Sequence, residues 1–260
     1  MNHPPSIRLD DVHKHYLVGD EPVPVLRGVS LDIWPGEYVA VVGASGNGKS
    51  TLLNMITGID HPSKGEVYVA GDALHTMSEE ALAVWRGRHL GIVFQFFQLL
   101  PSLSLLNNII LPMDFAGQIP KKERAARARH LLDLVGLADQ ADKLPGTVSG
   151  GQQQRAAIAR ALANDPPLVV ADEPTGNLDS ATSAEIYALF GDLVAQGKTL
   201  VMVTHSRTLA GQAGRVVEIV NGQIGRDRLT GAAAEAPQVQ LQARPIRLAR
   251  TEGAGVEIGS

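Results

Sequence analysis

Residues 38–57 read YVAVVGASGNGKSTLLNMIT. The β-branched run Tyr38–Val42 is typical of a short buried strand, and Lys49–Thr57 has the composition of a short helix. Between them, GASGNGKS at 43–50 matches the pattern of a loop whose backbone N–H groups close around phosphate oxygens. The N-terminus of the following helix also favours an anion. This strand, loop and helix predict a phosphate-binding α/β protein.

The loop supplies side chains as well as backbone donors. Lys49 adds a point charge, and the hydroxyl of Ser50 can be a ligand for Mg²⁺. A merely structural Gly-rich turn is the alternative, but the preceding strand and following helix argue against it. The residues predicted to hold the phosphates are Gly43, Ala44, Ser45, Gly46, Asn47, Gly48, Lys49, Ser50 and Thr51.

A second apolar run, LVVADE at 168–173, ends in two carboxylates. Asp172 closes a buried strand, at the end where ligands collect in parallel sheets, and can hold Mg²⁺ through water. Glu173 is placed to polarise an attacking water, since a general base must reach the nucleophile. Alone, such a run is more often a solvated strand end. Together with the phosphate-binding loop it predicts hydrolysis of a nucleotide.

A second candidate anion site opens another helix, at SGGQQQR (149–155). Ser149, Gly150 and Gly151 offer a hydroxyl and backbone donors at a helix N-terminus. One chain then has two phosphate-binding helix starts, although one nucleotide needs only one. An ordinary capped helix is the alternative interpretation.

Three further residues are candidates from their positions. Gln95 ends a predicted strand, where its amide can contact both Mg²⁺ and water. His205 follows the strand predicted at 200–204 and can donate a hydrogen bond to a terminal phosphate. Tyr16, upstream of the loop, can stack on a purine ring, with a packing role as the alternative.

The rest of the chain alternates strands and helices, which predicts a largely parallel sheet covered on both faces. Pro120–Val135 is predicted to be a helix, and a second one runs from Ser149 to about 163. No strand is indicated between them, so this region reads as a helical insertion. Residues 216–224 read as a hairpin with Asn221-Gly222 at its turn.

Composition narrows the possible functions. The 260 residues carry a net charge of -4, which gives no case for nucleic-acid binding, and there is no cysteine. The N-terminus lacks the apolar segment of a signal peptide. The uncharged stretch 90–113 is long enough to cross a bilayer, but we expect no span because seven polar or proline residues interrupt it. These are Gln95, Gln98, Pro101, Ser102, Ser104, Asn107 and Asn108.

The order of these motifs resembles that of ABC transporter nucleotide-binding subunits, from about Ile7 to Ile224. DEPTGNLDS (172–180) and FQFFQLLPSLSLLNNIILP (94–112) resemble one branch: macrolide exporters, lipoprotein-releasing complexes and FtsE-type cell-division ATPases. Val148, where the family usually has Leu, and Asn47, where Ser is commoner, are mild departures.

The resemblance implies a P-loop NTPase fold with a RecA-like, mostly parallel core, an antiparallel β subdomain and a helical subdomain. The ATPase domain would span 1–229, with its helical part at about 96–160, and 230–260 would be a flexible extension. The substrate would be ATP with Mg²⁺. Catalysis is expected at Glu173, His205 and Gln95, and metal binding at Ser50, Gln95 and Asp172.

The resemblance also implies partners. Two copies would enclose two ATPs between the loop of one and Ser149–Gly151 of the other, with Asp179 coupling the sites. An FtsX-like or MacB-like integral-membrane permease would receive the motion, so the chain would lie in the cytoplasm, on the inner face of the membrane. Control of an extracytoplasmic cell-wall hydrolase without transport is the alternative. Soluble repair or translation ATPases are disfavoured, because the chain has neither a long coiled coil nor a second cassette.

Overall fold

The computed structural model describes residues 4–206 and 210–230. The strand predicted before the phosphate-binding loop, Tyr38–Val42 (β3), lies inside a six-stranded sheet of order β10-β9-β3-β8-β7-β6. All neighbours from β9 to β6 pair in parallel, and only β10 is antiparallel. The other strands are Leu90–Val93 (β6), Leu168–Asp172 (β7), Thr199–Val203 (β8), Arg215–Val220 (β9) and Gln223–Leu229 (β10). The predicted, mostly parallel core is confirmed.

Alternate residues of β3 enter different cores, because successive side chains of a strand point to opposite faces. Val39 and Val41 join a core with α1 (Lys49–Thr57) and the antiparallel sheet. Ala40 and Val42 join a second core with the helices of the other side. Both faces of the sheet are therefore covered, as a parallel sheet requires.

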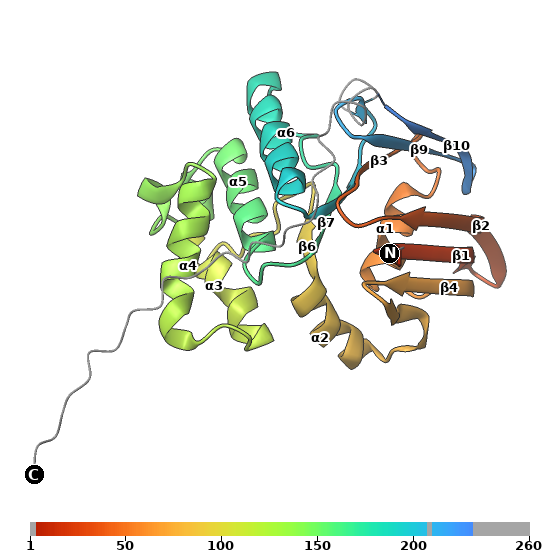
Figure 1. Cartoon of the computed structure of the whole chain (residues 1–260), viewed down its shortest axis with the longest axis horizontal. Helices are drawn as coiled ribbons and strands as arrows, with labels where there is room; N and C mark the ends of the chain where they lie inside the picture. Colours follow the sequence, from red (N-terminus) through yellow and green to blue (C-terminus); the bar gives the residue numbers. More distant parts are fainter. Residues whose placement is uncertain (1–3, 207–209, 231–260) are drawn as a thin grey trace, which may run out of the picture.

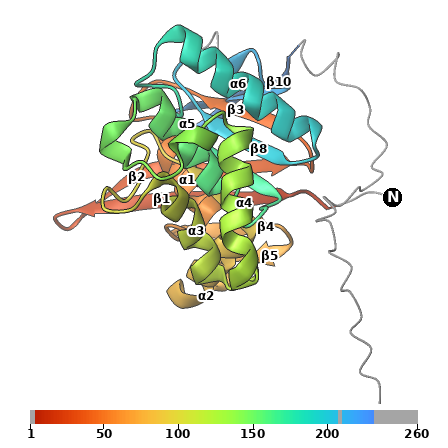
Figure 2. The ribbon, with the colours of Figure 1, turned by 90° about the vertical axis from the view of Figure 1, so that its left-hand side faces the viewer.

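The second sheet is antiparallel, with the order β2-β1-β4-β5, and this prediction is also confirmed. It contains Ile7–Val18 (β1), Glu21–Ile33 (β2), Lys64–Val69 (β4) and Asp72–Ala73 (β5). Figure 1 shows it at the right of the molecule, with α3, α4 and α5 at the left and the parallel sheet between them. Figure 2 shows the β1–β2 hairpin projecting beyond the rest of the chain.

Most predicted helices begin and end within a few residues of the observed ones, but one was missed. Within the predicted helical part at about 96–160, Leu105–Ala116 forms α3, capped by Ser104, for which no separate helix was predicted. Pro112 and two asparagines hid its periodicity. The other helices are Glu79–His89 (α2), Lys121–Leu134 (α4), Gly150–Ala161 (α5) and Ser180–Ala195 (α6), with 3₁₀ turns at Leu74–Thr76, Ala138–Gln140 and Pro145–Thr147.

Among the described residues, none of the helices combines the length and the hydrophobicity that a membrane span needs. The predicted C-terminal extension is described only at Thr230, whose N–H donates to the Gly214 carbonyl at 2.9 Å. Residues 231–260, with the flexibility expected of them, lie outside the described residues.

Candidate functional site

The candidate site lies at the carboxyl ends of four adjacent parallel strands. The phosphate-binding loop follows β3, His205 follows β8, Asp172 and Glu173 end β7, and Gln95 follows β6. Because these strands are neighbours in the order β3-β8-β7-β6, residues far apart in sequence come to one edge of the sheet. The structure therefore brings together the loop, the paired carboxylates, Gln95 and His205.

The phosphate-binding loop is fixed to the β9–β10 hairpin. A Cβ on Gly43 would lie 2.4 Å from the Ile219 carbonyl oxygen, so only glycine fits there. Asn47 donates through Nδ2 to the same Ile219 carbonyl at 2.9 Å, and its own carbonyl accepts from Gly222 N–H at 3.2 Å. This link was not predicted, because nothing local in the sequence connects the loop with a hairpin so far along the chain.

Lys49 lies under the loop, 8% exposed. Its Nζ donates to the carbonyls of Gly43 and Ala44, at 3.0 Å each, which curls the loop around the ammonium group. The helix behind it starts at Gly48 in a left-handed conformation, with no side chain capping its first N–H groups. Backbone donors and one buried positive charge thus face the same place, which suits a polyphosphate.

Asp172 and Ser50 form the candidate metal site. The Ser50 hydroxyl lies beside the Asp172 carboxyl and lowers its pKa. The Oδ1 atom of Asp172 is buried with no hydrogen-bond partner. A buried carboxylate oxygen without a donor, beside a hydroxyl, fits a hard cation such as Mg²⁺. When bound, the ion would neutralise phosphate charge there. Gln95, the third predicted ligand, lies near Gly176, as does the Glu173 carboxylate.

Burial raises the pKa of Asp172, and the nearby Glu173 raises it further against the opposing effects of Ser50 and Lys49. A carboxyl whose pKa is raised on folding binds more protons in the native state. Its contribution to the free energy of unfolding therefore falls as pH rises above the ordinary carboxyl pKa of 3.8. Ionisation of Asp172 therefore costs the nucleotide-free protein stability.

We expect Asp172→Asn to raise the melting temperature of the nucleotide-free protein at pH 7 by a few degrees Celsius. The same change should weaken the dependence of ATP binding on Mg²⁺, since the charged oxygen is lost. Thermal unfolding and binding titrations check both. Asp192→Asn, at an exposed position of α6, is the control. A lower melting temperature for Asp172→Asn would contradict the assigned cost of this charge.

Glu173 has a constrained backbone. Its φ is 48°, a left-handed value unusual for a residue with a side chain, and its N–H donates to the Val203 carbonyl at 3.0 Å. The side chain is 18% exposed and its Oε2 is hydrogen-bonded to His205 Nδ1. A Cβ on Gly176 would lie 3.1 Å from Gln95 Nε2 and 3.7 Å from Glu173 Oε2. The carboxylate, amide and imidazole therefore surround one small space.

The segment Ser149–Gly151 is held elsewhere. Ser149 caps α5 and accepts from Gln152 N–H at 3.2 Å, while Gln152 Oε1 accepts from Ser149 N–H at 2.9 Å. A Cβ on Gly151 would lie 2.6 Å from Thr182 Cγ2, so α5 starts tightly against α6. Figure 1 shows α5 and α1 well apart, with β6 and β7 between them. In this chain the segment is an ordinary capped helix start, distant from the phosphate-binding loop.

The Asp179 side chain also makes hydrogen bonds within its own chain, at the start of α6. It caps α6, accepting from Thr182 N–H at 2.9 Å and from the Thr182 hydroxyl at 2.7 Å. These hydrogen bonds lower the pKa of the Asp179 carboxyl. Since Thr182 also contacts Gly151, Asp179 supports the SGGQ helix start. The role expected of Asp179 in coupling the sites of two copies stays a prediction.

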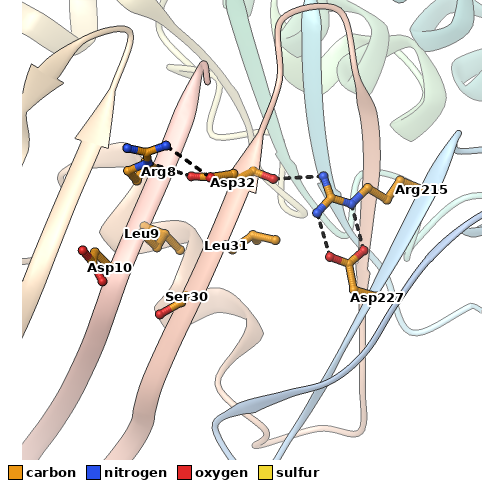
Figure 3. A pocket seen from close by; sticks show the side chains of 8 residues that line it. All are labelled: Arg8, Leu9, Asp10, Ser30, Leu31, Asp32, Arg215 and Asp227. Atoms are coloured by element: carbon orange, nitrogen blue, oxygen red, sulfur yellow. Dashed lines mark hydrogen bonds and ion pairs between the residues drawn. The ribbon is translucent and has the colours of Figure 1, made fainter. Parts of the chain in front are cut away.

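A hollow of about 390 Å³ opens at the other end of the sheet (Figure 3). Arg215, in its lining, pairs with Val39 at the start of β3, whereas the phosphate-binding loop follows the end of that strand. Arg8 is hydrogen-bonded to Asp32, and Arg215 to Asp227. Both arginines of the lining are thus paired with carboxylates, and the hollow takes no part in the candidate site.

Comparison with known proteins identifies the family. Residues 26–176 match the ABC transporter family model. The chain is 50% identical over 218 residues to an uncharacterized ABC transporter ATP-binding protein of Thermotoga maritima, covering 84% of this chain and 93% of that one. It is 45% identical to the macrolide export ATP-binding/permease protein MacB of Shigella flexneri over 86% of this chain, but spans only 34% of that relative.

A solved structure agrees with the sequence matches. A dimeric, post-hydrolysis ATP-binding cassette bound to ADP and Pi has a TM-score of 0.80 and 40% identity, covering 86% of this chain and 98% of that one. The predicted P-loop NTPase fold and the resemblance to macrolide-export proteins are confirmed. The chain belongs to the ABC transporter family, as one of its ATP-binding ATPase domains.

Proposed function

We propose that the chain hydrolyses ATP between two of its copies and thereby drives an integral-membrane permease in an export complex. The observation that carries the proposal is that two sets of candidate residues lie apart within one chain. One edge of the parallel sheet gathers the loop, Asp172, Glu173, Gln95 and His205, while the SGGQ helix start belongs to the other lobe. A second copy can bring that start to the ATP.

In this proposal each group has a distinct task. Lys49 and the loop N–H groups bind the phosphates, and Tyr16 stacks on the adenine. Ser50 and Asp172, with Gln95, would hold Mg²⁺.

Glu173 takes a proton from the attacking water, while His205 orients that carboxylate and the terminal phosphate. Ser149–Gly151 of the second copy completes the site, with Asp179 supporting it. ATP then holds the dimer together, and loss of phosphate releases it.

The names of the relatives favour export. MacB of Shigella flexneri and PvdT of Pseudomonas entomophila are ATP-binding/permease proteins for macrolide and pyoverdine export, and this chain matches about a third of each. We propose that residues 1–229 correspond to their ATPase domain, with a helical part at about 96–160 and an extension from 230. The chain would then work in the cytoplasm, at the inner face of the membrane.

The permease would dock in a groove of about 350 Å³ between α2 and α3. Leu99 packs into the core, whereas Phe96 and Leu100 remain exposed, and Phe115 is 82% exposed. So many exposed apolar side chains are typical of a protein-binding surface. The groove is lined by Ala83, Gly87, Leu100, Asn108, Leu111, Pro112, Phe115 and Arg160.

We expect cysteines at Leu100 or Phe115 to crosslink to a cytoplasmic helix of the permease. The chain has no native cysteine, so each link is assigned without background. Leu229→Cys, also strongly exposed but at the end of β10, is the control and should not link. Crosslinks confined to other parts of the ATPase would exclude this groove as the docking site.

A further inference from the structure

Tyr16 lies where β1 loses one of its two neighbours. β1 pairs with β4 only as far as His13, opposite Lys64, but pairs with β2 up to Val18, opposite Glu21. From Lys14 onward the strand is half of a two-stranded ribbon, which by itself is marginally stable. Figure 2 shows this hairpin projecting from the molecule. Other contacts must therefore fix the Tyr16 ring.

Asp60 provides two of these contacts, one from each carboxylate oxygen. Its Oδ2 accepts from the Tyr16 hydroxyl at 3.0 Å, and its Oδ1 accepts from Lys14 Nζ at 2.6 Å. Lys14 Nζ also donates to the His61 carbonyl at 2.8 Å. Burial alone would raise the pKa of Asp60, but the hydrogen bonds from Lys14 and Tyr16 outweigh it and lower that pKa. The carboxylate is therefore charged at neutral pH.

Lys14 also acts on the ring directly. Its Nζ lies 5.0 Å from the centroid of the Tyr16 ring, within the range of a cation–π interaction. The ammonium takes one face of the ring. Tyr16 is 40% exposed, which leaves part of the ring accessible to a planar base. Asp60, by holding Lys14, keeps the ammonium group over that face of the ring.

Asp60 is itself attached to the helix that carries the phosphate-binding residues. α1 ends at Gly58, and the N–H groups of Ile59 and Asp60 donate to the Asn54 carbonyl at 3.0 and 3.3 Å. Near the other end of α1, the Thr51 side chain lies close enough to the Tyr16 hydroxyl to lower its pKa. The ring and the phosphate-binding loop are thus fixed to one nine-residue helix. Their separation is then set by α1 rather than by the hairpin.

We infer that Asp60 is a positioning residue, which holds the Tyr16 ring through its hydroxyl and through Lys14 so that a purine base can stack at a fixed distance from the phosphate-binding loop. This inference rests on the proposed stacking of Tyr16 on adenine. It distinguishes base from phosphate: Asp60 should matter for a nucleoside triphosphate and not for a bare triphosphate chain.

The experiment compares affinities for ATP and for inorganic tripolyphosphate in the purified chain. Tyr16→Ala should weaken ATP binding about tenfold, the size of one base stack, and leave tripolyphosphate binding unchanged. Asp60→Ala should weaken ATP binding roughly three- to tenfold, also with tripolyphosphate unchanged. Asp60→Asn, which keeps the shape and one acceptor, should lie between Asp60→Ala and the wild type.

Asp227→Ala is the matched control. Asp227 pairs with Arg215 at 2.6 Å, the same separation as Asp60 and Lys14, with similar exposure (Figure 3). It lies at the other end of the sheet and should not change the ratio of the two affinities.

The outcomes distinguish a failure of the positioning role of Asp60 from a failure of the proposed stacking of Tyr16 on adenine. If Tyr16→Ala leaves the ratio of affinities unchanged, the stacking proposal is wrong. If Tyr16→Ala lowers ATP affinity selectively while Asp60→Ala and Asp60→Asn keep the wild-type ratio, the positioning role is overturned. Equal weakening of both ligands in the Asp60 variants would indicate general structural damage and would also overturn it.

Discussion

Glu173→Gln should leave ATP binding intact and lower ATP turnover by about a hundredfold or more, the usual range for removal of a general base. A hundredfold corresponds to about 2.7 kcal/mol of transition-state stabilisation. The amide keeps the size of the side chain and one acceptor for the His205 contact, so the backbone at φ 48° should be undisturbed. What is lost is the ability to take a proton from water.

The measurement is steady-state phosphate release beside equilibrium ATP binding, with size analysis of the protein in ATP. Because hydrolysis releases the proposed dimer, the variant should accumulate as an ATP-bound dimer. Glu66→Gln, an exposed glutamate on β4, is the control and should turn over like the wild type. Wild-type turnover by Glu173→Gln would remove this residue from catalysis.

The parts of the fold that the sequence predicted well are those decided by local pattern. α1 follows directly from GASGNGKST, and the β9–β10 turn has positive φ at both Asn221 and Gly222, as a type I′ turn requires. α3 was missed because Pro112 breaks its pattern and Asn108 resembles a loop residue. In fact Asn108 is buried and bonded to the carbonyls of Leu100, Leu103 and Ser104, so it organises the preceding turn.

The same distinction holds for the candidate site. Motifs at strand ends suggested which residues meet, since neighbouring parallel strands end at one edge. Contacts between distant segments had no such signal: Asn47 with Ile219, Asp60 with Tyr16, and Arg160 with the carbonyl of Phe97. Phe97 and Gln98 have positive φ, and Arg160 on α5 donates to both carbonyls. Contacts of this kind, between segments that are distant in the sequence, are visible only in the folded chain.

The composite site makes the second large prediction: Ser149→Arg should abolish ATP-driven dimerisation and with it hydrolysis. In the proposed dimer Ser149 faces the γ-phosphate across the interface, where ATP charge exceeds what Lys49 alone neutralises. A bulky side chain there would keep the two copies apart. ATP binding to one chain should persist, because α5, the helix that Ser149 caps, lies apart from α1, the helix that follows the phosphate-binding loop.

Loss of the helix cap must be separated from loss of the interface. Ser149 accepts from Gln152 N–H at 3.2 Å, and removing such a cap costs about 1 kcal/mol of stability. Ser78 caps α2 in the same way, accepting from Ala81 N–H at 3.3 Å, and both serines are exposed. Ser78→Arg therefore loses a matched cap away from the site, and should dimerise and hydrolyse ATP like the wild type.

Mixing two inactive variants tests whether the site is shared between copies. Lys49→Ala disables the loop, and Ser149→Arg disables the opposing helix start. A mixed dimer can place both defects at one site and leave the other intact, so activity should partly return if one intact site turns over alone. The Ser149→Arg variant by itself also tests whether the site is shared, and this test does not require one intact site to turn over alone. If Ser149→Arg alone dimerises and hydrolyses ATP normally, this helix start has no role in the partner's site, and the second anion-binding motif of the sequence is only a capped helix.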